Sequence, residues 1–246
     1  MTLITGLRCS DAVVLASDSQ VTVEGGLKTT AQKLFCTRHG IIWGTAGPIA
    51  AAQAIEAHFN ELIMDGNPGR DTGRQGVKQV MLAAAADMKG PDGHAAGGLF
   101  KGLFAWYSAE DQRYYLLQAR SDGTVELQEQ GYSAVGSPSS SELARFAFFG
   151  FSSSGFLEYA TLPVEAAKML IHTITNDAVN VSAQGVDGPI QLAVATATGA
   201  GVLEEADLKP VQDTAGAFKM HQADFLKRTD ESGEEGGASG LIPGDE

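Results

Sequence analysis

The segment Thr2-Leu3-Ile4-Thr5-Gly6-Leu7-Arg8-Cys9, continued by residues 11–20, decides the fold class. Apolar residues dominate 2–9 and 12–17, and Ser10-Asp11 separates the two runs, so two successive strands are predicted. The second run, Ala-Val-Val-Leu-Ala-Ser, is apolar without alternation, which is typical of a strand covered on both faces. The sheet that contains these strands therefore needs a layer of structure on each side.

The rest of the chain alternates between groups of strands and pairs of helices. Further strands are predicted over residues 34–36, 40–46, 99–106, 113–120, 124–129, 133–135 and 190–195. Helices are predicted from Pro48 to about residue 62, over 75–88, over 139–149, from Pro163 onward and over 215–227. This order predicts an α+β chain in which two stacked antiparallel sheets each carry an outer helix layer, a four-layer αββα sandwich.

Composition and charge bound the function classes. The 246 residues carry a formal net charge of −13, which argues against nucleic acid or an anionic membrane surface as a partner. No apolar run is long enough to cross a bilayer, and no charged-then-apolar leader opens the chain. The two cysteines and five histidines show no metal-ligand spacing, so neither a metal nor another cofactor is assigned. We expect a cytoplasmic protein.

Domain organisation is simple in this reading. Residues 1–228 contain no stretch that resembles a linker, so they are predicted to form one domain. Residues 229–246 carry six acidic side chains, no Lys or Arg, and several Gly and Ser, so they are predicted to form a disordered acidic tail.

Thr2 directly follows Met1, and this is the first sign of chemistry. Removal of Met1 would leave Thr2 with a hydroxyl and a free α-amine on one residue. An α-amine titrates near pH 8, so it can serve as a base for its own hydroxyl near neutrality. Many ordinary proteins also begin Met-Thr, so this position alone decides nothing.

The motifs that follow Thr2 carry a resemblance. The run Val13-Val14-Leu15-Ala16-Ser17-Asp18-Ser19-Gln20, then Lys33-Leu34-Phe35, then Gly44-Thr45-Ala46-Gly47, resembles the β-type subunits of the 20S proteasome and the bacterial peptidase HslV. The nearest match is the bacterial proteasome homologue subgroup, and the likeness spans about residues 2–200. It implies the N-terminal nucleophile hydrolase form of the αββα sandwich.

The resemblance assigns six catalytic residues. Thr2 is the nucleophile, and either its own amine or Lys33 is the base, an alternative that the sequence leaves open. Asp18 supplies the counter-charge that a buried lysine requires. The backbone N–H of Gly47 would stabilise the oxyanion, while Ser137 and Asp177 are expected beside the Thr2 amine. Taken one at a time, these residues are also compatible with purely structural roles, such as a turn residue, a solvent-exposed lysine or a helix cap.

The expected substrate contacts are less specific. The predicted substrate-binding residues are Gln20, Thr22, Thr45, Ala46 and Ala50. The last three are small and weakly polar, so a pocket for apolar side chains is expected. The spacing from Asp18 to Lys33 is one residue shorter than in most relatives, which calls for a shortened turn over residues 21–30.

The leading hypothesis is a threonine-type endopeptidase that assembles into stacked homo-oligomeric rings of six- or seven-fold symmetry. Such rings would enclose the active sites and admit only unfolded polypeptides, and the resemblance also implies an ATP-dependent unfoldase as partner. Two alternatives stay open: an acylase that cleaves small amides without ring assembly, and a non-catalytic ring or scaffold subunit.

Overall fold

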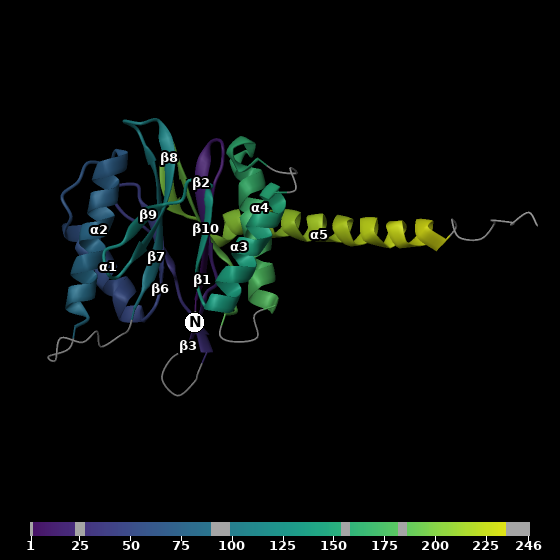
Figure 1. The fold of residues 1–246 in the computed structure, drawn as a ribbon, viewed down its shortest axis with the longest axis horizontal. Coiled ribbons are helices and arrows are strands. Elements are labelled where there is room, and N and C mark those ends of the chain that lie inside the picture. Colours follow the sequence, from purple (N-terminus) through teal and green to yellow (C-terminus); the bar gives the residue numbers. More distant parts are fainter. Residues whose placement is uncertain (1, 23–27, 90–98, 154–157, 182–185, 235–246) are drawn as a thin grey trace, which may run out of the picture.

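The computed structural model describes residues 2–22, 28–89, 99–153, 158–181 and 186–234. Within these ranges, two five-stranded antiparallel sheets face each other, and helices cover the outer face of each sheet (Figure 1). The predicted αββα sandwich is therefore confirmed.

The first sheet has the strand order β10-β1-β2-β11-β12. Its strands are β1 (Leu3–Arg8), β2 (Ala12–Ser17), β10 (Tyr132–Gly136), β11 (Gln191–Thr196) and β12 (Gly199–Val202). Strand β1 lies between β2 and β10, and in this register Leu3 is opposite Gly136. Thr2 therefore lies at the end of an interior strand rather than on a free arm.

The second sheet has the order β5-β6-β7-β8-β9. Its strands are β5 (Leu34–Cys36), β6 (Ile42–Ala46), β7 (Lys101–Ser108), β8 (Arg113–Arg120) and β9 (Val125–Leu127). A separate two-stranded ribbon joins β3 (Gln20–Thr22) to β4 (Lys28–Thr30). The sequence reading treated residues 21–30 only as a turn, so this ribbon and β12 were not predicted.

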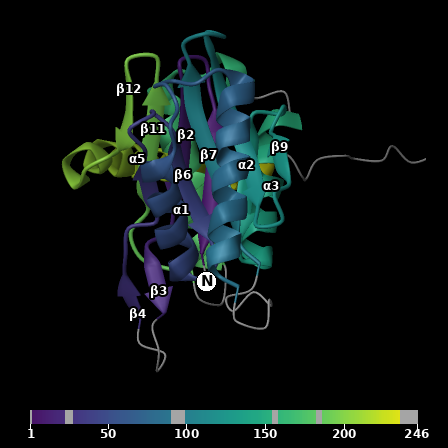
Figure 2. The same cartoon turned by 90° about the vertical axis from the view of Figure 1, so that its left-hand side faces the viewer.

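Four helices form the outer layers. Helices α1 (Ile49–Glu61) and α2 (Arg70–Asp87) cover the second sheet, whereas α3 (Pro138–Ser153) and α4 (Val164–Val181) cover the first (Figures 1 and 2). A short 3-10 helix spans Tyr159–Thr161. Helix α5 (Glu205–Glu234) contacts α4 and extends away from the sandwich (Figure 1). It is longer than the predicted 215–227 and includes residues 229–234 of the segment that was expected to be a tail.

Helix α2 begins at Arg70, before the predicted start at residue 75. Contacts with residues that are distant in the sequence explain this earlier start. The backbone N–H of Arg70, in the first turn, donates to the Asp111 carboxylate at 2.8 Å. Gly73 packs so closely that an added Cβ would lie 2.6 Å from the Trp106 ring. These contacts hold the residues from Arg70 up to the predicted start in a helical conformation.

Three hydrophobic layers explain the continuous apolar pattern of the first strands. On β1, Leu3 and Leu7 pack toward α3 and α4, whereas Ile4 packs between the two sheets. On β2, Val14 faces the helices and Leu15 faces the second sheet. Both faces of these strands are buried, so apolar residues predominate at successive positions.

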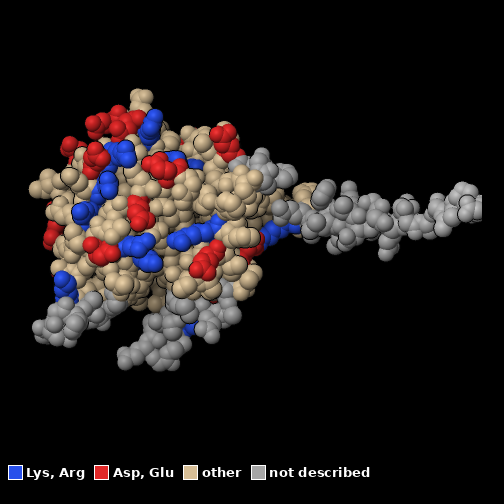
Figure 3. Space-filling view, viewed as in Figure 1, with Lys and Arg blue, Asp and Glu red and all other residues tan. Residues whose placement is uncertain are grey.

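The surface is mixed in charge on the face in Figure 3, where acidic and basic side chains are interspersed. None of the described helices combines the length and apolarity that a bilayer crossing demands.

Candidate active site

Asp18 joins the start of β1 to Lys33. Its Oδ1 accepts a hydrogen bond from the backbone N–H of Leu3 at 2.8 Å, and its Oδ2 pairs with Lys33 Nζ at 2.7 Å. Asp18 is 0% exposed and Lys33 is 7% exposed. One carboxylate therefore fixes both the lysine and the residue that directly follows Thr2.

Burial controls the electrostatics of this pair. Desolvation lowers the pKa of Lys33 below its usual range, and the Asp18 carboxylate opposes that shift only in part. Desolvation likewise raises the pKa of Asp18, against the charge of Lys33 and the hydrogen bond from Leu3. A lowered pKa brings Lys33 nearer to the range in which an amine can accept a proton at neutral pH.

Ser137 holds Thr2 from the other side. Its backbone N–H donates to the Thr2 carbonyl oxygen at 2.9 Å, and its own carbonyl accepts from Ser141 N–H in the first turn of α3. The preceding Gly136 has φ +140°, and a Cβ there would collide with the Thr2 carbonyl. A glycine is needed because the backbone of β10 passes directly against Thr2.

Thr2, Lys33 and Gly47 line one cavity of about 510 Å³ between α1, the β3–β4 ribbon and the edge of the second sheet. Figure 2 shows the ribbon beside the lower end of α1, close to the N-terminus. Gly47 lies between β6 and α1, and an added Cβ would lie 2.5 Å from Phe100 Cβ. The remaining lining residues are Gln20, Val21, Ala31, Gln32, Phe35, Thr45, Pro48, Ile49, Ala52, Gln53 and Glu56.

Some of the predicted substrate-binding residues line this cavity and others do not. Gln20 and Thr45 line the cavity, whereas Ala46 and Ala50 are not among its lining residues. Ala46 packs against the core between the sheets instead, and Ala50 is exposed on α1. Thr22 ends β3, and its side chain is outside the described set.

The sequence reading missed the wall that α1 contributes. Ile49, Ala52, Gln53 and Glu56 have the spacing i, i+3, i+4 and i+7, which places them on one helix face. This face meets the cavity, while Ala51, Ile55 and Phe59 form the buried face. The sequence predicted this helix, but its periodicity did not indicate that the face opposite the core lines a cavity.

Asp177 does not take the predicted place. Its carboxylate forms an ion pair with Lys219 of α5, and its side chain is 54% exposed. The expectation that it points to the Thr2 amine is therefore wrong. One α4 side chain that does contact β1 is Thr175, whose Oγ1 lies 2.6 Å from Thr5 Oγ1. Asp177 lies at the margin of the buried face of α4, where α5 approaches.

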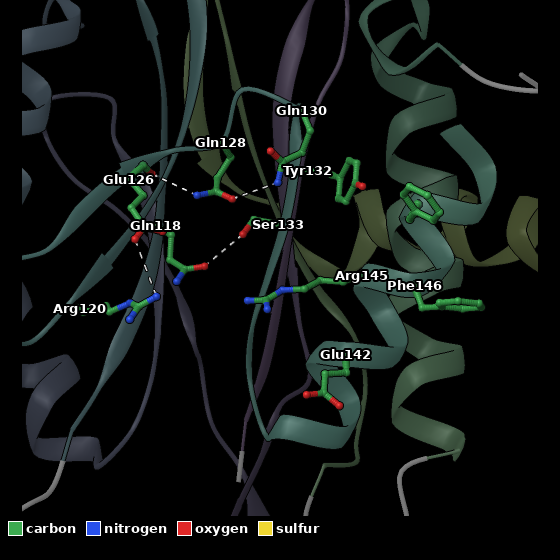
Figure 4. A pocket seen from close by; sticks show the side chains of 11 residues that line it. Gln118, Arg120, Glu126, Gln128, Gln130, Tyr132, Ser133, Glu142, Arg145 and Phe146 are labelled. Carbon is green, nitrogen blue, oxygen red and sulfur yellow. Dashed lines mark hydrogen bonds and ion pairs between the residues drawn. The ribbon is translucent and has the colours of Figure 1, made fainter. Parts of the chain in front are cut away.

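A second cavity, of about 520 Å³, lies between β8, β9, β10 and α3 (Figure 4). Its polar groups pair with one another: Gln118 accepts from Ser133 at 3.4 Å, and Arg120 approaches Glu126 at 3.8 Å. Arg145 in turn donates to the Ala134 carbonyl. This cavity lacks a nucleophile paired with a base, so the candidate active site is the cavity at Thr2.

The described residues give little support for a metal site or a catalytic thiol. No group of three or more His, Cys, Asp or Glu side chains there is placed to hold a metal ion. Cys9 and Cys36 are free thiols, and burial raises the pKa of Cys9 to about 11, so this thiol stays protonated and a poor nucleophile.

Comparisons with known proteins find solved structures of similar fold. No family model and no curated protein matches the chain. Among solved structures, the chain is similar to the Anbu (Gly-1) mutant from Hyphomicrobium sp. strain MC1, with a TM-score of 0.67 and 15% identity. It is also similar to Anbu (ancestral beta-subunit) from Yersinia bercovieri, with a TM-score of 0.67 and 14% identity. Each comparison covers 99% of this chain and 100% of the other.

These neighbours correct one expectation. The sequence motifs favoured the bacterial proteasome homologue subgroup and HslV, whereas the structural neighbours are Anbu proteins, so that subgroup assignment is wrong. At 14–15% identity the likeness establishes the shared αββα sandwich fold and nothing finer. The function therefore has to be argued from the chain's own residues.

Proposed function

We propose that the chain is a threonine-type peptidase of the N-terminal nucleophile class, active after Met1 has been removed. The observation that carries this proposal is that Thr2, Lys33 and Gly47 line one cavity, with Lys33 held by a fully buried Asp18. A buried ion pair adds little net stability, so a functional reason for its retention is the better explanation.

The reaction follows from this arrangement. Thr2 Oγ attacks the peptide carbonyl carbon, and its proton passes to the Thr2 amine or to Lys33. The N–H of Gly47, at the start of α1, stabilises the negative oxygen, because backbone donors and the helix dipole both favour an anion there. The C–N bond then breaks, the amine leaves with a proton, and water hydrolyses the Thr2 ester.

Assembly belongs to the same proposal. We infer a homo-oligomer of stacked rings whose chamber admits unfolded polypeptides, since a peptidase without strong sequence selectivity needs enclosure. An ATP-dependent unfoldase would then feed the chamber. Size-exclusion chromatography separates this from the small-amide acylase, because the chamber requires a particle many times larger than 25.7 kDa.

Matched N-terminal variants test the activity. Thr2→Ala keeps a small residue after Met1, so the terminus is still trimmed, but it removes the hydroxyl. Thr2→Ser keeps the hydroxyl. We expect fluorogenic peptides to be hydrolysed by the native chain and by Thr2→Ser, and not by Thr2→Ala. Equal hydrolysis by Thr2→Ala would reject Thr2 as the nucleophile, and a trimmed but inactive native chain would favour the scaffold alternative.

A further inference from the structure

Residues 31–33, the segment that carries Lys33 to the cavity, lie outside the hydrogen-bond ladders of the sheets. They join β4 to β5 and form neither strand nor helix. Backbone N–H and C=O groups in such a segment still need hydrogen-bond partners, because a buried group without one costs free energy. The position of Lys33 therefore depends on which groups supply these partners.

Gln191, the first residue of β11, supplies two of them through its side chain. Its Oε1 accepts a hydrogen bond from the Lys33 backbone N–H at 2.8 Å, and its Nε2 donates to the Ala31 carbonyl oxygen, also at 2.8 Å. The amide thus binds the segment as the peptide group of a neighbouring strand would, with one acceptor and one donor. A side chain that lacks either group cannot make both bonds.

Gln191 also stands beside the carboxylate partner of the lysine. In the register of the first sheet it is opposite Ser17, which directly precedes Asp18. On the other side of this aspartate, the Ser19 carbonyl oxygen accepts a hydrogen bond from the Ala31 N–H at 2.8 Å. The segment is therefore tied to the chain on both sides of the carboxylate.

Strand β6 closes the other side of the lysine backbone. An added Cβ at Gly44 would lie 2.8 Å from the Lys33 carbonyl oxygen, so this backbone packs directly on β6. The lysine side chain is long and flexible, and the place that its Nζ can reach follows from where the backbone is held. Here Nζ reaches Asp18 Oδ2 at 2.7 Å.

We propose that Gln191 is a positioning residue, which holds the Lys33 backbone so that the lysine amine is placed for the reaction at Thr2. This rests on the proposed function, because the exact place of the amine affects a rate only if the amine assists Thr2. Gln191 does not line the cavity, so it acts through Lys33 and not on the substrate. Displacing a catalytic group by about 1 Å can cost on the order of a hundredfold in rate, so a loosened segment should be visible in kcat.

Gln191→Met tests the proposal, because methionine has a similar length but makes neither hydrogen bond. Tyr159→Phe is the matched control: it removes a buried hydrogen bond to the Phe148 carbonyl, outside the cavity. We expect Gln191→Met to lower kcat for fluorogenic peptides by about tenfold to a hundredfold, with KM changed by less than about twofold. Tyr159→Phe should keep the native kcat. Melting temperatures of both variants separate a loss of folding from a loss of rate.

Competitive acetylation with acetic anhydride gives a second readout, which does not require peptidase activity. The rate of Lys33 acetylation across a range of pH, followed by peptide mapping, reports the pKa of its amine. Desolvation holds this pKa below its usual range, against the opposing effect of Asp18. A loosened segment admits water, so in Gln191→Met the pKa should rise toward its ordinary value, and in Tyr159→Phe it should not move. A merely structural role would lower the melting temperature and leave the pKa of Lys33 unchanged.

The failures of the two proposals are distinguishable. A kcat for Gln191→Met within about twofold of that for Tyr159→Phe, or an unchanged pKa of Lys33, overturns the positioning role and leaves the peptidase standing. If a trimmed native chain cleaves no peptide, the peptidase is rejected, and the acetylation profiles alone then decide whether Gln191 places Lys33.

A second variant covers the case in which Gln191→Met does not fold. Gln191→Glu keeps the acceptor for the Lys33 N–H and loses the donor to the Ala31 carbonyl. Its kcat should fall below that of the native chain, and a native kcat in this variant would overturn the proposal.

Discussion

Replacing Lys33 with Met probes the buried pair at the centre of the site. Methionine keeps the length and apolar stem of lysine but removes the charge that faces Asp18 at 2.7 Å. The Asp18 carboxylate, 0% exposed, would then keep backbone hydrogen bonds, among them the one from Leu3, but no opposite charge from Lys33. Breaking a buried pair on one side costs about 3–5 kcal/mol, because it leaves an uncompensated charge.

The stability that Lys33→Met loses should be larger at high pH than at low pH. Lys33 lowers the pKa of Asp18, so its removal raises that pKa further above the ordinary value. A carboxyl whose pKa is raised on folding favours the folded state in acid and loses that stability as pH rises through the folded-state pKa. The difference between native chain and Lys33→Met is therefore expected to be large at pH 8 and smaller at pH 5.

Urea unfolding at fixed protein concentration measures this difference. Trp43 and Trp106 are buried in the layer between the second sheet and its helices, so their fluorescence reports unfolding. Combining Lys33→Met with Asp18→Asn should restore most of the stability, because the buried charge is gone and Asn still accepts from Leu3. A loss below 1 kcal/mol at pH 8, or a loss that does not shrink at pH 5, would refute this reasoning.

Three further perturbations probe the rest of the site. Gly136→Ala places a Cβ against the Thr2 carbonyl, so it should displace Thr2. We expect a large fall in kcat with a smaller loss of thermal stability, measured as the melting temperature. Unchanged kcat would contradict the placement of β10. Asp177→Asn removes a half-exposed ion pair with Lys219, so calorimetry should show a loss of at most about 1 kcal/mol, with kcat unaltered; a large fall in kcat would restore a catalytic role. An amine base, either the Thr2 α-amine, which titrates near pH 8, or Lys33, whose pKa is lowered, predicts that the reaction rate at Thr2 rises as the pH becomes more alkaline, and a pH-independent rate would count against an amine base.

Local pattern predicted the parts of the molecule that depend on local physics. The unbroken apolar run of β2 indicated burial on both faces, and the two faces do pack into different core layers. The need for a counter-charge linked Lys33 to Asp18, and the structure places these two side chains in an ion pair. Such inferences succeed because burial constrains both pattern and charge wherever the element lies.

Contacts between distant segments were not predictable in this way. Asp111 extends α2 from 41 residues away, and Lys219 draws Asp177 toward α5 from 42 residues away. The cavity wall on α1 was missed because Gln53 and Glu56 read as a solvated helix face. Each of these features depends on which other element packs nearby. The residue pattern within one helix or strand does not indicate which element that is.

Labelling with a peptide epoxyketone is the most direct measurement of the central claim that Thr2 is the nucleophile. This reagent bonds to both the hydroxyl and the free amine of an N-terminal threonine, so intact mass and peptide mapping locate it. We expect the native chain without Met1 to gain one inhibitor mass on Thr2, and Thr2→Ala to gain none. A trimmed native chain that stays unlabelled, or labelling elsewhere that persists in Thr2→Ala, would contradict the account.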